Sequence, residues 1–235
     1  MEAMEKEPIP APTAGARALR LGDVAPVFQA RSTMGDVRLD QFRGRWLIFF
    51  SHPADFTPVC SSEFVALARA APQFEAIGCA LLGLSVDSLY SHLAWVRAIR
   101  DLFGVTVPFP IVEDPTMTIG RAYGMLDESA RDSSAMRATY YIDPQGVVRA
   151  LTWYPLTVGR SVEEMLRLAT ALQRAASGDV MTPEGWTPGA DLLLPPTSDA
   201  AAALAPGATN SWFYRTCPDP SFRDPSFRDP NRKDK

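Results

Sequence analysis

Cysteine and histidine are scarce in this chain, whose 235 residues include three cysteines and two histidines. The cysteines, Cys60, Cys79 and Cys217, are widely spaced and odd in number, which does not fit the disulfide framework of a small secreted domain. With only His52 and His92 and no C-x-x-C pair, the sequence also argues against a zinc site. Any cysteine chemistry is therefore expected to be redox or nucleophilic, with no metal and no other cofactor.

Long apolar runs and basic runs are missing as well. The longest apolar run, Trp46 to Phe50, suits a buried strand and is far shorter than the roughly 20 residues of a membrane span. The first 20 residues contain acidic residues and prolines but no apolar segment like that of a secretory signal. A net charge of −4 does not suggest a basic surface that would bind nucleic acid or an anionic membrane. We therefore expect a cytoplasmic protein with small-molecule or protein partners.

Apolar patterns predict alternating strands and helices. Residues 45–50 and 79–86 are typical of central strands covered on both faces, and the helical period between them predicts a helix. A second helix is predicted at 89–103, with Asp87 or Ser88 as N-cap and Gly104 as its stop. Its expected buried stripe consists of Leu89, Leu93, Val96 and Ile99.

A hairpin and a third helix follow. Residues 138–154 predict two strands around the turn Asp143–Gly146. Residues 161–177 predict a helix with a capping box of Ser161 and Glu164. The complete order is strand, helix, strand, helix, strand, strand, helix, which indicates an α/β sandwich around a central mixed sheet.

Changes of composition predict four regions. They are a flexible N-terminal extension at 1–19, a main α/β domain at 20–177, a small loop-rich arm at 178–217 and a disordered tail at 218–235 that repeats a short polar unit.

The stretch SHPADFTPVCSSEF, residues 51–64, places Cys60 at the start of the first helix. Thr57 suits the N-cap and Pro58 the first helical position, because the missing N–H of proline is unpaired there in any case. Cys60 then faces unpaired backbone N–H groups and the positive end of the helix dipole, which favour an ionised sulfur. A buried structural cysteine is the alternative, but this setting favours a reactive thiol.

The segment PADFTPVC, from Pro53 to Cys60, matches the P-x-x-x-[TS]-x-x-C signature of the peroxiredoxins. DFTPVCSSE resembles the one-cysteine, peroxiredoxin 6 branch, and the likeness continues through LGDVAPVF, YYIDPQG, YPLTVGR, TPEGW and WFYR, over about residues 20–217. It implies a thioredoxin-like AhpC/TSA peroxidase domain and a C-terminal arm of the one-cysteine type. The arm would embrace a partner in a homodimer or a larger ring.

The resemblance also implies the chemistry. Cys60 would reduce hydrogen peroxide and organic hydroperoxides, become a sulfenic acid and be recycled by an external thiol, either thioredoxin-like, glutathione-like or another. Thr57 would hydrogen-bond the sulfur and the peroxide, Pro53 would shield the thiolate, and Arg137 would be the active-site arginine. Donors aimed along the S–O–O line would stabilise the transition state.

Arg137 and Glu63 each have two possible interpretations. Arg137 taken alone would be a surface strand residue, and Glu63 could either hold a guanidinium in place or be a solvated helix residue. Arg160 matches a further arginine of the branch and is a supporting candidate. His52 matches a histidine of the branch and is assigned no proton transfer.

The other two cysteines have different expectations. Cys79 begins an apolar strand and is predicted to be buried. Cys217 lies in the arm, where some relatives carry a resolving cysteine, so it is either the thiol that resolves the sulfenic acid across the dimer or an idle thiol.

The sequence also bears on two other function classes. A thioredoxin-type disulfide reductase would need C-x-x-C, which Pro58–Ser61 does not supply. A peroxide sensor or chaperone-like assembly protein would use the same thiol as a switch, and slow stoichiometric oxidation would favour it over a peroxidase. Residues 44–53 lack the lipase-like G-x-S-x-G element of mammalian members of the branch, so phospholipase activity is not expected.

Overall fold

The computed structural model describes residues 19–126, 136–197, 199–205 and 211–220. The predicted N-terminal extension and the predicted repeat tail fall for the most part outside them. The chain divides into two compact units, with the boundary between Val162 and Glu163, and each is described by itself.

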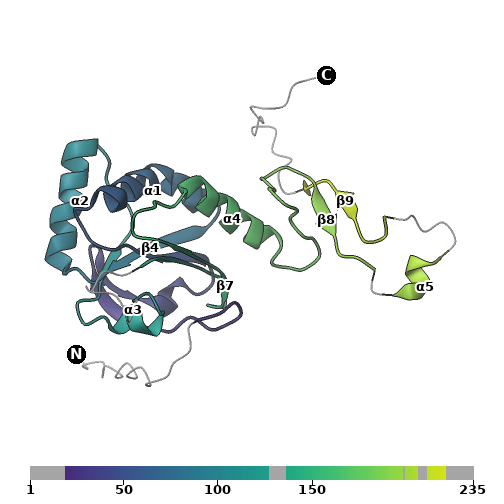
Figure 1. The fold of residues 1–235 in the computed structure, drawn as a ribbon, viewed down its shortest axis with the longest axis horizontal. Helices are drawn as coiled ribbons and strands as arrows, with labels where there is room; N and C mark the ends of the chain where they lie inside the picture. The colour runs from purple at the N-terminus through teal and green to yellow at the C-terminus, as the bar shows by residue number, and fades with distance from the viewer. Residues whose placement is uncertain (1–18, 127–135, 198, 206–210, 221–235) are drawn as a thin grey trace, which may run out of the picture. The chain divides into compact units, whose positions relative to one another are not determined.

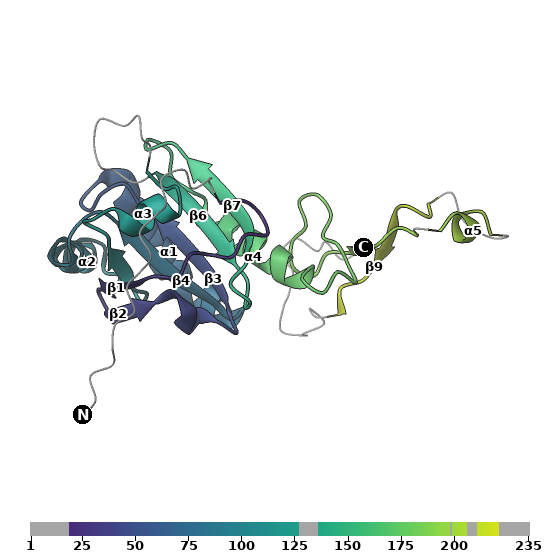
Figure 2. The ribbon, with the colours of Figure 1, turned by 90° about the horizontal axis from the view of Figure 1, so that it is seen from below.

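The first unit is built on a seven-stranded mixed sheet in the order β2-β1-β5-β4-β3-β6-β7 (Figures 1 and 2). Strands β3, β4 and β5 are parallel to one another, and the other neighbouring pairs are antiparallel. This confirms the predicted α/β class with a central mixed sheet. The strands are β1 (Gln29–Ser32), β2 (Gly35–Arg38), β3 (Trp46–Ser51), β4 (Cys79–Ser85), β5 (Ile111–Glu113), β6 (Arg137–Ile142) and β7 (Val148–Tyr154).

Helices cover the sheet on both sides, with α1 on one face and α3 on the other (Figure 1). The helical elements of this unit are η1 (Leu39–Phe42), α1 (Pro58–Ala76), α2 (Leu89–Phe103) and α3 (Thr118–Ala122). No helix in the described part of the chain is long and apolar enough to cross a membrane. Strands β1, β2 and β5 and helix α3 were not predicted, because segments of three to five residues are too short to show a period.

Strand β3 is apolar because both of its faces are buried. Phe49 makes an edge contact with Tyr123, at 4.8 Å between ring centroids, while the next residue, Phe50, contacts Phe64 of α1 at 5.7 Å. Successive side chains of a strand point to opposite faces, so one strand supplies the core on each side of the sheet. The end of β3 is thereby fixed, and the connection to α1 starts from a rigid point.

The predicted stripe of α2 is wrong at Leu93, which is exposed. The helix begins after Ser88 and ends at Gly104, as predicted, but its buried residues are His92, Trp95 and Ile99. A histidine is not expected on an apolar face from periodicity alone. His92 is buried because its ring finds a carboxylate partner.

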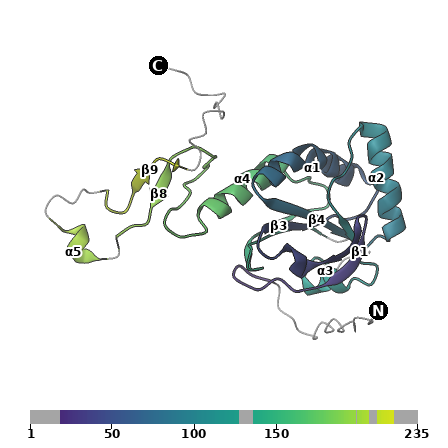
Figure 3. The same ribbon diagram turned by 180° about the vertical axis from the view of Figure 1, so that it is seen from behind.

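The second unit contains a small hydrophobic cluster of its own. Ala171, Val180, Trp186 and Leu192 form the cluster, and the partly buried Cys217 packs against it. The elements are α4 (Val162–Arg174), β8 (Leu192–Leu194), α5 (Ala200–Ala203) and β9 (Arg215–Cys217), with β8 and β9 antiparallel (Figure 3).

Ordered contacts in this unit continue to Asp219. This residue falls at the start of the predicted tail, yet its carboxylate is buried and accepts a hydrogen bond from Nε of Arg174 at 3.0 Å.

A buried carboxylate holds the connection between β3 and α1. Asp55 accepts hydrogen bonds from Nε2 of His52 at 2.9 Å and from Nδ1 of His92 at 2.8 Å, and all three side chains are buried. The backbone N–H of Asp55 donates to Oδ2 of Asp87 at 2.9 Å. Asp87 follows β4 and His92 lies in α2, so the connection is tied to both neighbouring elements.

The protonation of this group follows from its burial and its bonds. Burial by itself raises the pKa of Asp55, but the hydrogen bonds and charges of the two histidines hold that pKa well below its usual value. Burial lowers the pKa of His52. An ionised carboxylate only accepts hydrogen bonds, so each imidazole donates an N–H to it. The far ring nitrogens, His52 Nδ1 and His92 Nε2, have no hydrogen-bond partner among the described residues.

We predict that mild acid destabilises the fold through this group. Because the pKa of His52 is lower in the folded protein, the unfolded chain takes up the proton first. The stabilisation is complete above about pH 6.5 and is lost as the pH falls toward the folded pKa. The free energy of unfolding, measured with urea, should be about 1 kcal/mol lower at pH 5.5 than at pH 7.5.

The chain offers a clear control, because its only two histidines lie in this group and few other side chains titrate in this range. His52→Gln keeps a donor but cannot take up a proton, so it should lose most of the pH dependence. An unfolding free energy of the unaltered protein that is equal at the two pH values would contradict the prediction.

Candidate active site

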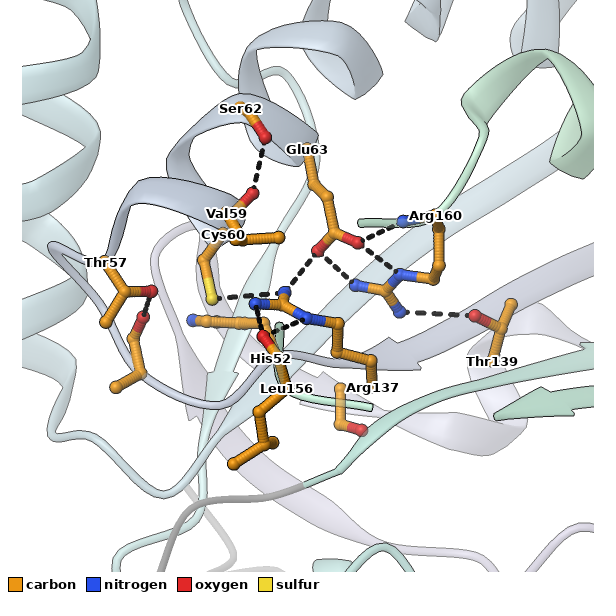
Figure 4. Close-up of polar contacts among 12 residues, drawn as sticks. His52, Thr57, Val59, Cys60, Ser62, Glu63, Arg137, Thr139, Leu156 and Arg160 are labelled. Atoms are coloured by element: carbon orange, nitrogen blue, oxygen red, sulfur yellow. Dashed lines mark hydrogen bonds and ion pairs between the residues drawn. The ribbon is translucent and has the colours of Figure 1, made fainter. Parts of the chain in front are cut away.

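Cys60 lies in the first turn of α1, directly after the connection from β3 (Figure 4). Thr57 is the N-cap and Pro58 the first helical residue, as predicted. The first helical hydrogen bond runs from the N–H of Ser61 to the carbonyl of Thr57, at 2.9 Å. The N–H groups of Val59 and Cys60 precede it, so the helix itself supplies no acceptor for them.

Thr57 uses its hydroxyl differently from an ordinary N-cap residue. The hydroxyl donates to the carbonyl of Ala54 at 2.8 Å and caps no N–H of α1. An N-cap oxygen usually accepts from the second or third helical N–H. The N–H groups of the first turn therefore remain available to an anion beside them, and the sulfur of Cys60 is in that turn.

Arg137 reaches Cys60 from the first position of β6. Its Nη1 lies 3.4 Å from Sγ of Cys60 and donates to Oε2 of Glu63 at 2.8 Å. Its Nε and Nη2 donate to the carbonyl of Leu156, at 3.1 and 2.8 Å (Figure 4). Arg137 is only 2% exposed, so the alternative of a surface strand residue is wrong.

Glu63 joins two guanidinium groups. Besides Arg137, it accepts from the backbone N–H and Nε of Arg160 at 2.7 and 3.0 Å, and from Nη2 of Arg160 at 2.8 Å. Arg160 also donates from Nη1 to the carbonyl of Ala138 and to Oγ1 of Thr139, both at 3.2 Å. Glu63 is 3% exposed, so the alternative of a solvated helix residue is wrong.

The charges of this buried group favour an anion at Cys60. Burial alone raises the pKa of Glu63, but the hydrogen bonds and charge of Arg160, with a smaller contribution from Arg137, hold that pKa below its usual value. One carboxylate and two guanidinium groups leave one uncompensated positive charge, which is costly in a buried site. A thiolate at Cys60 makes the group neutral.

The backbone around the site is closely packed on one side and strained on the other. Gly159 lies against α1, since a Cβ at this position would be 3.3 Å from Cγ1 of Val59. In the connection to α1, Pro53 is buried, while Phe56 is exposed and has a φ of 57°. Few residues other than glycine adopt this left-handed conformation.

The structure therefore brings Cys60, Glu63, Arg137 and Arg160 into one group, with Thr57 and Pro53 in the adjoining connection. Sequence reasoning missed the carbonyl of Leu156, which receives two bonds from Arg137, because no side-chain pattern marks a carbonyl acceptor. It also missed the pairing of His92 with Asp55. The sequence signal that could have indicated this pairing is that the chain has only two histidines.

The same histidines offer the one group of possible metal ligands found among the described residues. His52, Asp55 and His92 each present one ligand atom, all within 4.8 Å of one another. Both carboxylate oxygens of Asp55 already accept hydrogen bonds from the two rings, so we assign the group to holding the connection.

The other cysteines lie elsewhere. Cys79 is buried at the start of β4, as predicted, and burial raises the pKa of its thiol to about 12. A thiol of this kind is inert at neutral pH. Cys217 is half-buried in β9, within the second unit, and all three cysteines are free thiols.

The sequence and the fold are similar to those of known proteins. Residues 21–151 match the AhpC/TSA family, and residues 171–205 match the C-terminal domain of 1-Cys peroxiredoxin. A peroxiredoxin of Aquifex aeolicus is 47% identical over 170 residues, which cover 72% of this chain and 77% of the relative. Peroxiredoxin 2 of Caldanaerobacter subterraneus is 44% identical over 177 residues, which cover 75% and 80%.

Solved structures agree with these matches. The yeast mitochondrial 1-Cys peroxiredoxin aligns with a TM-score of 0.76 at 34% identity, over 86% of this chain and all of that chain. Peroxiredoxin 6 of Arenicola marina aligns with a TM-score of 0.73 at 34% identity, over 79% of this chain and 88% of that one. The two family matches, the relatives of 47% and 44% identity and the shared thioredoxin-like fold show that the chain belongs to the peroxiredoxins, the family of thiol-dependent peroxidases.

Proposed function

We propose that Cys60 is the nucleophile with which this peroxiredoxin reduces hydrogen peroxide and organic hydroperoxides. The observation that carries the proposal is the contact of 3.4 Å between Nη1 of Arg137 and Sγ of Cys60. It lies at the N-terminus of α1, in a buried group that is neutral only with a thiolate. Both features favour the ionised sulfur that attacks a peroxide.

The proposed first step is a two-electron transfer. The thiolate attacks one peroxide oxygen, a sulfur–oxygen bond forms and the oxygen–oxygen bond breaks. Cys60 is oxidised to a sulfenic acid, and the other oxygen leaves as hydroxide or alkoxide and takes up a proton. Negative charge moves from sulfur toward the leaving oxygen, so fixed donors beside that line stabilise the transition state. The guanidinium of Arg137 and the N–H of Cys60 are suited to this role.

Thr57 and Pro53 have supporting roles in this proposal. The hydroxyl proton of Thr57 is engaged with the carbonyl of Ala54, so its oxygen can accept the O–H of a bound peroxide. The buried ring of Pro53 would keep water from the sulfur, which strengthens the electrostatic contribution of Arg137.

Recycling requires thiols. A first thiol displaces water from the sulfenic acid and forms a disulfide with Cys60, and a second thiol reduces that disulfide and restores Cys60. Cys79 is unsuited to either step, because its thiol is buried with a raised pKa. A study of the yeast mitochondrial 1-Cys peroxiredoxin describes its resolution through the glutathione and thioredoxin systems. We propose that an external thiol of one of these kinds, or Cys217 of a partner subunit, acts here.

A homodimer or a larger ring is part of the proposal. In the second unit, Trp212, Phe213 and Tyr214 are exposed, and adjacent exposed aromatic side chains often mark a protein interface. In the first unit, β7 lies at the end of the sheet, and its first residue, Val148, exchanges backbone hydrogen bonds with Gly22 and Asp23, so a partner strand could pair with β7 only beyond Val148.

We predict that Cys60→Ser abolishes turnover. With a thiol such as dithiothreitol in excess, the unaltered protein should consume many equivalents of hydrogen peroxide, and the variant should be slower by about three orders of magnitude or more. Cys79→Ala is the matched control and should remain active. Full activity of Cys60→Ser would refute the proposal, and consumption of a single equivalent by the unaltered protein would favour the sensor.

Loss of the guanidinium should slow the first step. We expect Arg137→Ala to lower the rate of Cys60 oxidation about a hundredfold or more, because a transition-state donor is lost. The rate should also need a higher pH, because the thiolate loses its charged partner. Arg149→Ala is the control, since Arg149 is a strand arginine that pairs with Asp143 at 2.6 Å. Equal rates for the two variants would contradict the prediction.

The role of Cys217 can be tested on a non-reducing gel. After one equivalent of peroxide, a disulfide-linked dimer that disappears in Cys217→Ser and in Cys60→Ser would identify Cys217 as the resolving thiol. A monomer band that carries a trapped sulfenic acid would exclude it and leave the external thiol.

A further inference from the structure

We propose that Ser51 is a positioning residue, which fixes the backbone of Arg137 and thereby aims the guanidinium at Cys60. The inference rests on the proposed role of Arg137. The backbone pairing between β3 and β6 stops at Phe50, the residue before Ser51.

The hydroxyl of Ser51 continues this pairing beyond the last strand pair. The register between β3 and β6 runs from Leu47 opposite Ile142 to Phe50 opposite Thr139. Ser51 is the next residue of β3, and there a side chain replaces the backbone. Its hydroxyl donates to the carbonyl of Met136 and accepts from the N–H of Ala138 at 3.2 Å. One hydroxyl thus binds the residues on either side of Arg137.

The backbone at Arg137 is a tight turn held on two sides. The N–H of Ala138 also donates to the carbonyl of Met136 at 2.8 Å, which closes a three-residue turn with Arg137 at its centre. On the other side, Arg137 is paired with Tyr154 of β7. Ser51 is fully buried, so water cannot replace its hydroxyl if that hydroxyl is removed.

The direction of the guanidinium depends on this backbone. The side chain of Arg137 donates to Leu156, Glu63 and Cys60 together. A rotation of the turn would shift all of these contacts at once. Displacement of a catalytic group by about 1 Å can cost up to a hundredfold in rate, so a partial loosening should cost about tenfold.

The chain provides a matched control in Ser32. Its hydroxyl also bonds two backbone groups, donating to the carbonyl of Gly35 at 2.6 Å and accepting from the N–H of Met34 at 3.1 Å. Ser32 is 4% exposed and lies in β1, away from Cys60 in the sheet order. Ser32→Ala therefore removes a hydroxyl of the same kind without touching the site.

The experiment compares Ser51→Ala with Ser32→Ala in a single turnover. The rate of Cys60 oxidation by hydrogen peroxide is followed by tryptophan fluorescence as a function of pH. Both variants should unfold at a lower urea concentration than the unaltered protein. Only Ser51→Ala should be about tenfold slower, with its rate profile moved to higher pH. A merely structural role of Ser51 would move the unfolding midpoint and leave the profile unchanged.

A second pair isolates the hydroxyl from the volume of the side chain. Ser51→Thr and Ser51→Val have the same shape, and only the threonine keeps the donor and acceptor. The threonine variant should retain the rate and profile of the unaltered protein, and the valine variant should resemble Ser51→Ala. Equal profiles for threonine and valine, or for Ser51→Ala and Ser32→Ala, would overturn the inference. If Arg137→Ala stays slow in that case, the proposed function stands, whereas an unimpaired Arg137→Ala would refute the role of Arg137 itself.

Discussion

The carboxylate of Glu63, shared between the guanidinium groups of Arg137 and Arg160, is the interaction on which the rest of the site depends. Its negative charge lies between two buried guanidinium groups, and it offsets part of the cost of burying two positive charges close together. It also joins α1, which carries Cys60, to β6 and to the segment that follows β7. The local charge balance and the alignment of three elements are therefore set by one side chain, one helical turn from the sulfur.

A second carboxylate holds the connection that precedes Cys60 in the chain. Asp55 ties this connection to α2 through His92 and to the end of β4 through Asp87. Glu63 and Asp55 thus hold the two ends of the segment that contains the cysteine. Both remain ionised against their burial because their partners donate hydrogen bonds to them.

The sequence predicted those parts of the fold and site that depend on local patterns. The strands β3 and β4 and the ends of α2 follow from apolar runs and capping residues, and the position of Cys60 in α1 follows from Thr57 and Pro58. The burial of Glu63 could not be predicted, because its two arginine partners are 74 and 97 residues away in the chain. The error at Leu93 has the same origin, since the polar His92 took the buried position through a partner 37 residues distant.

Gly159 has a consequence for how reactants reach the sulfur. Because the segment before Arg160 packs on α1 so closely that even a methyl group at Gly159 would press on Val59, that wall of the site has no spare volume. Cys60 itself has no exposed surface. The sulfur can therefore be reached only when neighbouring segments move, and the close packing of Gly159 on Val59 opposes such movement of the segment before Arg160.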